Sequence, residues 1–175
     1  MKVKSQKSKV KSFCGGFSLL ETLVALAVLT AAVTGPMNLA TVSIRSASLA
    51  HNNIIASFLA EEGMELVRAK RDAGAYGGGW LSNLGPCTGG QSCIINVVDG
   101  AVSACSGTCP KIKYDSTTGL FSQAATGNDS IFTRTISITT LNANEVQVVV
   151  AMSWKERFLP QNSQVEIKTN LSNWK

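Results

Sequence analysis

The most constraining feature of the sequence is an apolar run that begins at Phe17, reaches about Val33 and contains one acid, Glu21. Leucine, valine and alanine occupy every side of the helix that this run would form, which fits contact with lipid better than packing of one face on a core. Extended to Val42, the run is long enough to cross a bilayer. An ionisable group is expensive to bury in such a segment, so Glu21 is a candidate functional residue.

The excess positive charge lies ahead of this run. The formal net charge is +5, and five lysines precede Gly16: Lys2, Lys4, Lys7, Lys9 and Lys11. Subtracting these five from the 16 Lys and Arg leaves eleven, which balance the 11 Asp and Glu of the remaining chain. Residues 1–16 are therefore interpreted as a basic leader that orients a membrane segment. Because the remainder is neutral, no nucleic-acid partner is predicted for this chain alone.

The helix is predicted to continue beyond the membrane segment to about Asp72. Residues 17–40 form its transmembrane half and residues 41–72 its amphipathic half. Apolar residues of the second half recur at helical spacing: Ile44, Ala47, Ile55, Phe58, Leu59 and Leu66. Gly35-Pro36 interrupts the first half, and a proline removes one helical hydrogen bond, so a kink or local melting is expected. This dipeptide marks either the membrane exit or a hinge.

Residues 73–175 are predicted to form a β-rich domain, because the glycine-rich stretch 73–79 cannot sustain a helix. A run rich in β-branched residues predicts a strand at 131–140, and period-two alternation with one apolar face predicts strands at 146–154 and 165–171. Such strands form an antiparallel sheet covered on one side, and the apolar stripe of the helix is the natural cover. The fold class predicted is therefore α+β, with a long N-terminal helix packed on a C-terminal antiparallel sheet.

Four cysteines of this domain lie close together in sequence: Cys87, Cys93, Cys105 and Cys109. An even set beyond a membrane anchor predicts two disulfides. A hairpin about Asp99-Gly100 would place Cys93 opposite Cys105, which favours the nested pairing Cys93–Cys105 and Cys87–Cys109 over the other two pairings. Zinc is the alternative, but there is no C-x-x-C spacing and the only histidine, His51, is distant, so no metal is predicted. Cys14, in the leader, is assigned no role.

The sequence contains no recognisable catalytic set. A serine triad would need His51, which lies in the helix, and the acids are scattered apart from Glu61, Glu62 and Glu65. Those three acids are interpreted as a solvated or neighbour-facing helix surface. We therefore expect a protein that is not an enzyme and holds no cofactor.

A secretory signal peptide cleaved near Ala31-Ala32 is one explanation of the N-terminus. Three features argue against it: the basic region is long, Glu21 lies inside the apolar core, and an amphipathic helix follows directly.

The run Gly16-Phe17-Ser18-Leu19-Leu20-Glu21-Thr22 resembles the processing site of type IV pilin-like proteins, the prepilins and pseudopilins. The basic leader, long helix and C-terminal β-domain match that family as well. The resemblance implies that a prepilin peptidase cuts between Gly16 and Phe17 on the cytoplasmic side and methylates the new Phe17 amine. It also implies that Glu21 is an assembly residue, which meets the N-terminal ammonium of a neighbouring subunit and sets register more than bulk stability.

The run from Leu59 to Asp72 resembles the mid-helix of minor pilins and minor pseudopilins, and the C-terminal Leu171-Ser172-Asn173-Trp174 is similar to theirs. Pro36 lies slightly earlier than in major pilins. The resemblance implies a structural subunit of a type IV pilus or a related type II secretion or competence filament. Its implied partners are prepilin peptidase, other pilin-like subunits through the N-terminal helix, the filament assembly platform, and membrane lipid before assembly.

The implied location is the cytoplasmic (inner) membrane, crossed once, with an extracytoplasmic C-terminal domain that later joins a cell-surface filament. Two alternatives stay open: a filament-tip adhesin or ligand-binding module, and a plain membrane-anchored extracytoplasmic protein.

Overall fold

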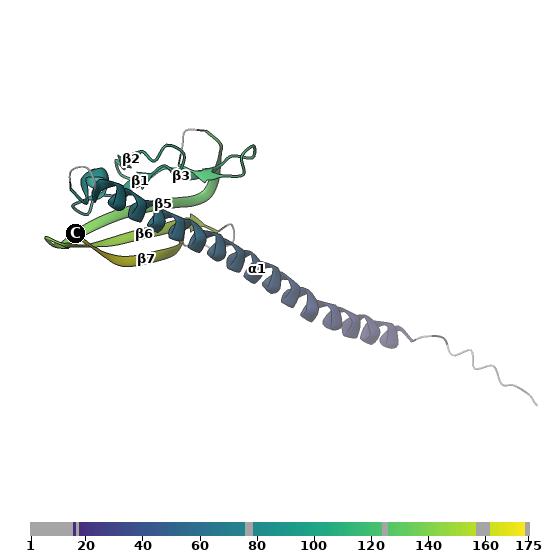
Figure 1. Ribbon diagram of the computed structural model, residues 1–175. Coiled ribbons are helices and arrows are strands. Elements are labelled where there is room, and N and C mark those ends of the chain that lie inside the picture. The colour runs from purple at the N-terminus through teal and green to yellow at the C-terminus, as the bar shows by residue number, and fades with distance from the viewer. Residues whose placement is uncertain (1–15, 17, 76–78, 124–125, 157–161, 174–175) are drawn as a thin grey trace, which may run out of the picture. The chain divides into compact units, whose positions relative to one another are not determined.

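The computed structural model describes residues 16, 18–75, 79–123, 126–156 and 162–173. The chain divides into two compact units, Met1–Ile44 and Arg45–Lys175. Helix α1 (Leu19–Ala75) contributes to both units. All strands belong to the second unit (Figure 1).

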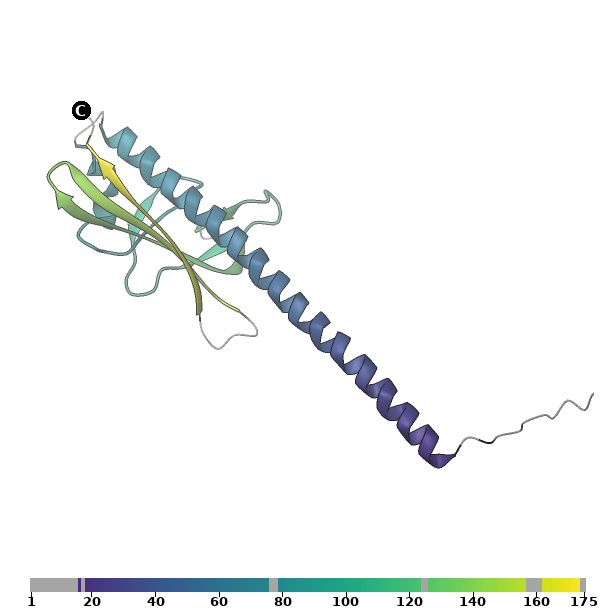
Figure 2. The ribbon, with the colours of Figure 1, turned by 90° about the horizontal axis from the view of Figure 1, so that it is seen from below.

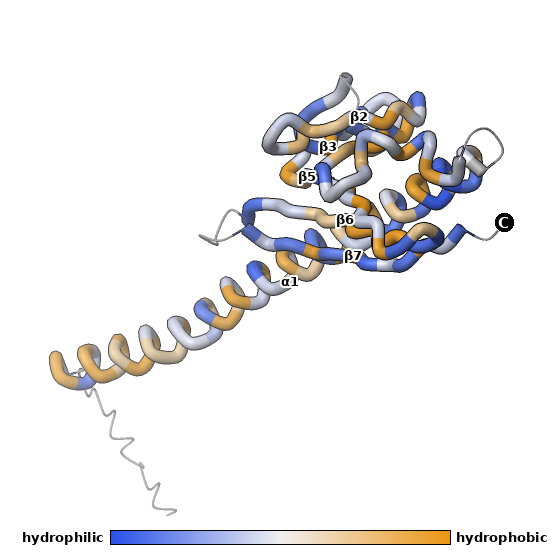
Figure 3. The backbone as a smooth tube through the Cα atoms, turned by 90° about the vertical axis from the view of Figure 1, so that its left-hand side faces the viewer, coloured by the Kyte–Doolittle hydropathy of each residue, from blue (hydrophilic) through white to orange (hydrophobic). Residues whose placement is uncertain are grey.

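In the first unit, α1 exposes all of its large apolar side chains, from Leu19 at 88% to Val33 at 55%. Figure 3 shows this part of the helix as mostly apolar turns, with paler and hydrophilic turns between them. It contains one segment whose length and composition would let it cross a membrane, which supports a membrane anchor. Helical structure runs through Gly35-Pro36, so the local melting predicted there does not occur. Proline removes one backbone hydrogen bond, which a long helix tolerates when the bonds on either side persist.

Threonine hydroxyls in this part of α1 are satisfied by the helix itself. Each donates to the carbonyl oxygen three residues earlier, over 2.8 to 3.2 Å: Thr22, Thr30, Thr34 and Thr41. A hydroxyl without a partner is costly away from water, and these bonds remove that cost.

The second unit is built on an antiparallel sheet in which the three longest strands follow one another as a meander. β6 lies between β5 and β7, and the other edge of β5 pairs with β1 and β3. β2 pairs with β1 and β4 pairs with β3. Figure 2 shows the three long strands beside the C-terminal part of α1. A short 3-10 helix, η1 (Ser82–Cys87), leads into the first strand. The strands are β1 (Cys93–Ile95), β2 (Val102–Ala104), β3 (Lys111–Tyr114), β4 (Phe121–Ser122), β5 (Asn128–Asn142), β6 (Glu145–Lys155) and β7 (Asn162–Ser172).

The predicted architecture is confirmed at this level: the three predicted strands coincide with β5, β6 and β7, and α1 packs on the apolar face of the sheet. The helix residues that face the sheet are partly different from those expected. Ile44 and Phe58 are 71% and 66% exposed. Between residues 56 and 67 the buried helix residues recur at i, i+3 and i+4: Ala56, Leu59, Ala60, Gly63, Met64 and Val67. Three of these six are alanine or glycine, which let the helix approach the strands closely.

Candidate functional site

The start of α1 is fixed by a local cap. The Ser18 hydroxyl accepts a hydrogen bond from the Glu21 backbone N–H at 3.2 Å, and the Ser18 carbonyl accepts one from the Thr22 N–H at 3.2 Å. Ser18 and Glu21 therefore stand at the N-cap and third helical positions, the spacing of a capping box. The cap explains why the helix begins at Leu19.

Glu21 lies in the first turn of α1. A carboxylate there is favoured by the partial positive charge of the helix N-terminus. Gly16, which precedes the predicted cut, is exposed. Phe17, the leader and Cys14 lie outside the described residues. The structure therefore places Gly16 and Glu21 on either side of the helix start and does not describe the residue between them that is predicted to become the new N-terminus.

In the second unit, the buried side chain of Arg134 links helix α1 to the sheet. The Arg134 guanidinium donates to Glu62 Oε2 at 2.7 Å and to the Leu59 carbonyl at 3.1 Å. A longer bond of 3.4 Å reaches the Ile95 carbonyl in β1. Arg134 thus ties together α1, β5 and β1. Glu62, expected on a solvated or neighbour-facing surface, is instead half-buried against this guanidinium.

A second polar contact joins the helix to the end of β6. The Glu156 carboxylate is buried and accepts hydrogen bonds from Asn52 Nδ2, at 2.9 and 3.1 Å, and from Trp154 Nε1, at 2.6 Å. Charge-assisted hydrogen bonds to a carboxylate are stronger than neutral ones. Asn52 and Glu62 therefore hold the sheet-covered part of α1 at two points, ten residues apart in sequence.

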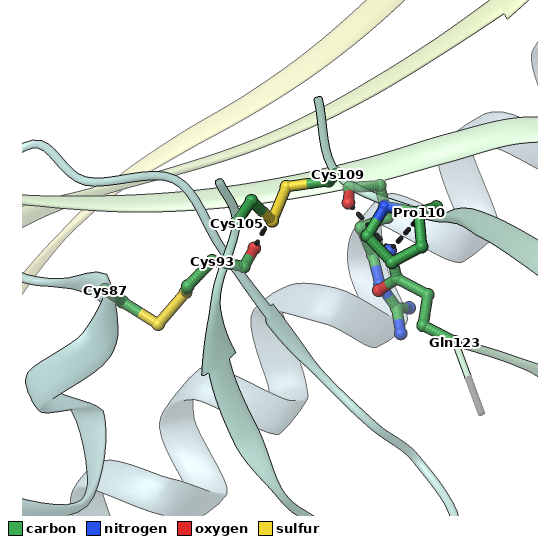
Figure 4. The surroundings of a disulfide bond; sticks show 7 residues. Cys87, Cys93, Cys105, Cys109, Pro110 and Gln123 are labelled. Carbon is green, nitrogen blue, oxygen red and sulfur yellow. Dashed lines mark hydrogen bonds between the residues drawn. A yellow bond between two sulfur atoms is a disulfide. The ribbon is translucent and has the colours of Figure 1, made fainter. Parts of the chain in front are cut away.

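The disulfides are Cys87–Cys93 and Cys105–Cys109, which corrects the nested pairing predicted above. The predicted hairpin exists, but its register differs by one residue, because Cys93 pairs with Ala104 and the Cys105 N–H donates to the Ser92 carbonyl. A one-residue offset turns a side chain to the opposite face, so Cys93 and Cys105 cannot meet across the strands. Figure 4 shows the two disulfides side by side. Cys109 Sγ lies 4.0 Å from the Cys93 carbonyl oxygen.

Gln123 fills a gap in the sheet next to these disulfides. β3 pairs with β5 as far as Thr133, and β1 pairs with β5 at Ile136. Between them the Arg134 carbonyl has no strand partner. The buried Gln123 amide donates to that carbonyl at 2.9 Å and to the Pro110 carbonyl at 3.0 Å (Figure 4). A side chain thus replaces a short stretch of strand, which satisfies a buried backbone acceptor.

Sequence reasoning missed Arg134, Glu156 and Gln123. The burial of Arg134 could have been inferred from the sequence, because Arg134 alternates with Phe132, Ile136 and Ile138, which lie on the buried face of β5. A charge at a core position of a strand needs a partner. Glu156 and Gln123 lie outside any regular pattern and had no such signal.

His51 is exposed on α1. Within the described ranges, no group of three or more His, Cys, Asp and Glu side chains is arranged to hold a metal ion.

Comparison with known proteins found no matching family model, no matching curated protein and no matching solved structure.

Proposed function

We propose that this chain is a minor pilin or pseudopilin, a structural subunit of a type IV pilus or a related type II secretion or competence filament. The observation that carries the proposal is the position of the helix start within the motif. Ser18 caps α1, so the Gly16–Phe17 bond lies just ahead of the helix, while Glu21 lies in its first turn. A peptidase needs an accessible backbone, and assembly needs a carboxylate close to the new N-terminus.

The exposed apolar side chains of α1 supply the rest of the argument. Before assembly they are satisfied by lipid, and in a filament they are satisfied by helices of other subunits. In either setting an unpaired Glu21 carboxylate is unfavourable. Cleavage creates an ammonium group on Phe17, and a neighbouring subunit can bring that group to Glu21. The pair favours one register of packing over others, because a shifted neighbour would leave both charges unpaired.

The proposed location follows from charge and redox chemistry. Five lysines before Gly16 keep the leader in the cytoplasm, where the peptidase acts. The disulfide-bonded domain then lies on the extracytoplasmic side, where disulfides persist.

The decisive experiment is mass spectrometry of the mature N-terminus, with the protein purified from a host that has the peptidase. We expect a chain that begins at Phe17 and carries one methyl group on its amine. A chain that keeps Met1, or one cleaved after Ala32, contradicts the proposal.

The role of Glu21 is tested by Glu21→Gln. We expect normal membrane insertion and cleavage but reduced incorporation into sheared filaments. Glu61→Gln is the matched control, since Glu61 is an exposed acid on the same helix. Equal incorporation of the Glu21 variant and the native protein would refute the assembly role.

A further inference from the structure

The outer edge of β7 is long, regular and open. β7 pairs with β6 along its whole length without a shift of register. On its other side, no strand among the described residues pairs with it. Figures 1 and 3 show β7 at the margin of the sheet. The far margin of β5 is different, because β1, β3 and the Gln123 amide fill it. A regular open edge is a template for another strand.

The backbone groups that face this edge belong to the even-numbered residues. The Asn173 N–H donates to the Asn144 carbonyl at 2.8 Å, at positions that continue the β6–β7 ladder by one pair. In an antiparallel ladder, alternate residues bond to the same neighbour. Odd-numbered residues of β7 therefore face β6, and even-numbered residues face outward. The side chains of these outward-facing residues are all exposed: Asn162, Gln164, Glu166, Lys168, Asn170 and Ser172.

The sequence of β7 is complementary to itself about Ile167. Placing a second β7 antiparallel with the two Ile167 residues opposed puts Glu166 opposite the second copy's Lys168, and Lys168 opposite its Glu166. The same register puts Gln164 opposite the second copy's Asn170. Even-numbered residues then meet even-numbered residues, so the free N–H and C=O groups of both strands pair as the ladder requires. Opposite charges directly across a strand pair are stabilising.

From this pattern we propose that β7 is a self-pairing edge, through which two copies of the chain join their sheets about a two-fold axis at Ile167. The interface is isologous, as the axis requires. Selectivity comes from Glu166 and Lys168. Glu166 and Lys168 form an ion pair with each other at 3.0 Å within one strand. A second β7 offers each of them a further opposite charge, whereas a foreign strand without the reversed charge pattern does not.

The geometry also says which copies can pair. A two-fold axis normal to the sheet leaves both helices on the same face, with residues 45–75 of the two copies running in opposite directions. Neighbouring subunits in one filament or one membrane run parallel. The edge therefore joins copies on separate filaments or on facing surfaces. The pairing of two copies through β7 uses only the strand and its charges, whereas the placement of these copies on separate filaments rests on the proposed pilin role.

The test uses the full-length chain in a density-matched detergent, where sedimentation equilibrium reports the dissociation constant. Glu166→Lys and Lys168→Glu each place like charges opposite one another at both ends of the pair. We expect each to weaken self-association about tenfold. The double variant Glu166→Lys/Lys168→Glu restores opposite charges and should recover native association.

A mixture of the two single variants controls for misfolding and for association through α1. Each single variant carries the charges that complement the other, so the mixture should associate as tightly as the native chain although neither variant does so alone. The proposal is overturned if the native chain is monomeric at the highest attainable concentration. It is also overturned if the single variants associate like the native chain, or if their mixture shows no gain.

Discussion

The Arg134 guanidinium and the Glu62 carboxylate lie 2.7 Å apart across a largely apolar interface between helix and sheet. The Arg134 side chain is 1% exposed and that of Glu62 is 38% exposed. Water therefore reaches the acid and hardly reaches the base. A buried cation in this position depends on its few protein partners. Removing one member of the pair should therefore destabilise the fold more than the distance between the two groups alone suggests.

Glu62→Ala removes the only carboxylate shown to contact Arg134 and leaves the guanidinium with backbone carbonyls. We expect the free energy of unfolding to fall by about 3 kcal/mol, near the lower end for an uncompensated buried charge. Denaturant titration of the detergent-solubilised chain measures this change. Glu65→Ala is the matched control, because its partner Arg68 is 43% exposed and such pairs contribute about 0–1 kcal/mol. Equal losses in the two variants would contradict the prediction.

Gly63 permits the close approach on which this contact depends. A Cβ atom at position 63 would lie 2.9 Å from Arg134 Cδ and 3.0 Å from Val150 Cγ1. Arg134 is held by its hydrogen bonds, so it cannot move aside freely. Gly63→Ala should therefore destabilise the second unit by about 1–3 kcal/mol, although alanine favours helix.

Gly85→Ala provides the comparison for Gly63, because nothing lies within 4 Å of a Cβ atom at that position. We expect that variant to unfold at nearly the native denaturant concentration. A Gly63 variant as stable as the Gly85 variant would show that the helix can shift to accommodate the added methyl group.

The two disulfides should differ in their reaction with reductants. Cys87 and Cys93 are fully buried, whereas Cys105 is partly exposed. Thiol–disulfide exchange requires access of a thiolate to one sulfur. Partial reduction followed by alkylation should therefore label Cys105 and Cys109 first. Peptide mapping checks the order and the pairing together, and a peptide that joins Cys93 to Cys105 would contradict the structure.

The turn between β3 and β4 should respond to acid through Asp115. The Thr117 N–H donates to its carboxylate at 2.8 Å and the Thr118 hydroxyl at 2.9 Å, and the Thr117 bond is the largest cause that lowers the pKa of Asp115 from 3.8. Because the folded pKa lies below the unfolded one, the stabilisation is present above the unfolded pKa and is lost as the pH falls through the folded value.

Titration by NMR should give a pKa below 3.8 for the Asp115 carboxyl group. Asp115→Asn removes the titrating group, so the difference in stability between native and variant chains should be constant well above the ordinary pKa of 3.8 and should narrow as the pH falls below it. The carboxyl is exposed, so the effect should be small. A pKa at or above the ordinary value would show that the turn does not hold the ionised form.

Much of the fold could be predicted because two periodicities are strong in this sequence. Alternation in β5 and β6 places Ile136, Val148 and Val150 on one face, and all three are fully buried. The helix face was harder to predict. The sequence prediction placed large residues such as Ile44 and Phe58 on the face that meets the sheet. Ala60 and Gly63 pack there instead, because small side chains let a helix approach the strands closely.

The contacts that sequence could not supply depend on register and on single side chains. The composition of the hairpin indicated a turn near Gly100, but pairing Cys93 with Ala104 was needed to exclude the Cys93–Cys105 disulfide. The role of Gln123 depends on an interruption between two strands that no local pattern encodes. The cap of α1 was not predicted, although its hydrogen bond from the Glu21 N–H to the Ser18 hydroxyl joins residues only three apart in sequence.

The inward-turned threonine hydroxyls of α1 have a consequence for recognition. From Leu19 to Met37 the helix carries three threonines, and the hydroxyl of each donates its hydrogen bond to a carbonyl oxygen of the helix backbone. Glu21 is the single charged side chain of that stretch. Any helix that packs there meets an almost uniform apolar cylinder on which rotations and slides differ little in energy. In that stretch Glu21 is the one charge with which a cation on a packing helix can form an ion pair.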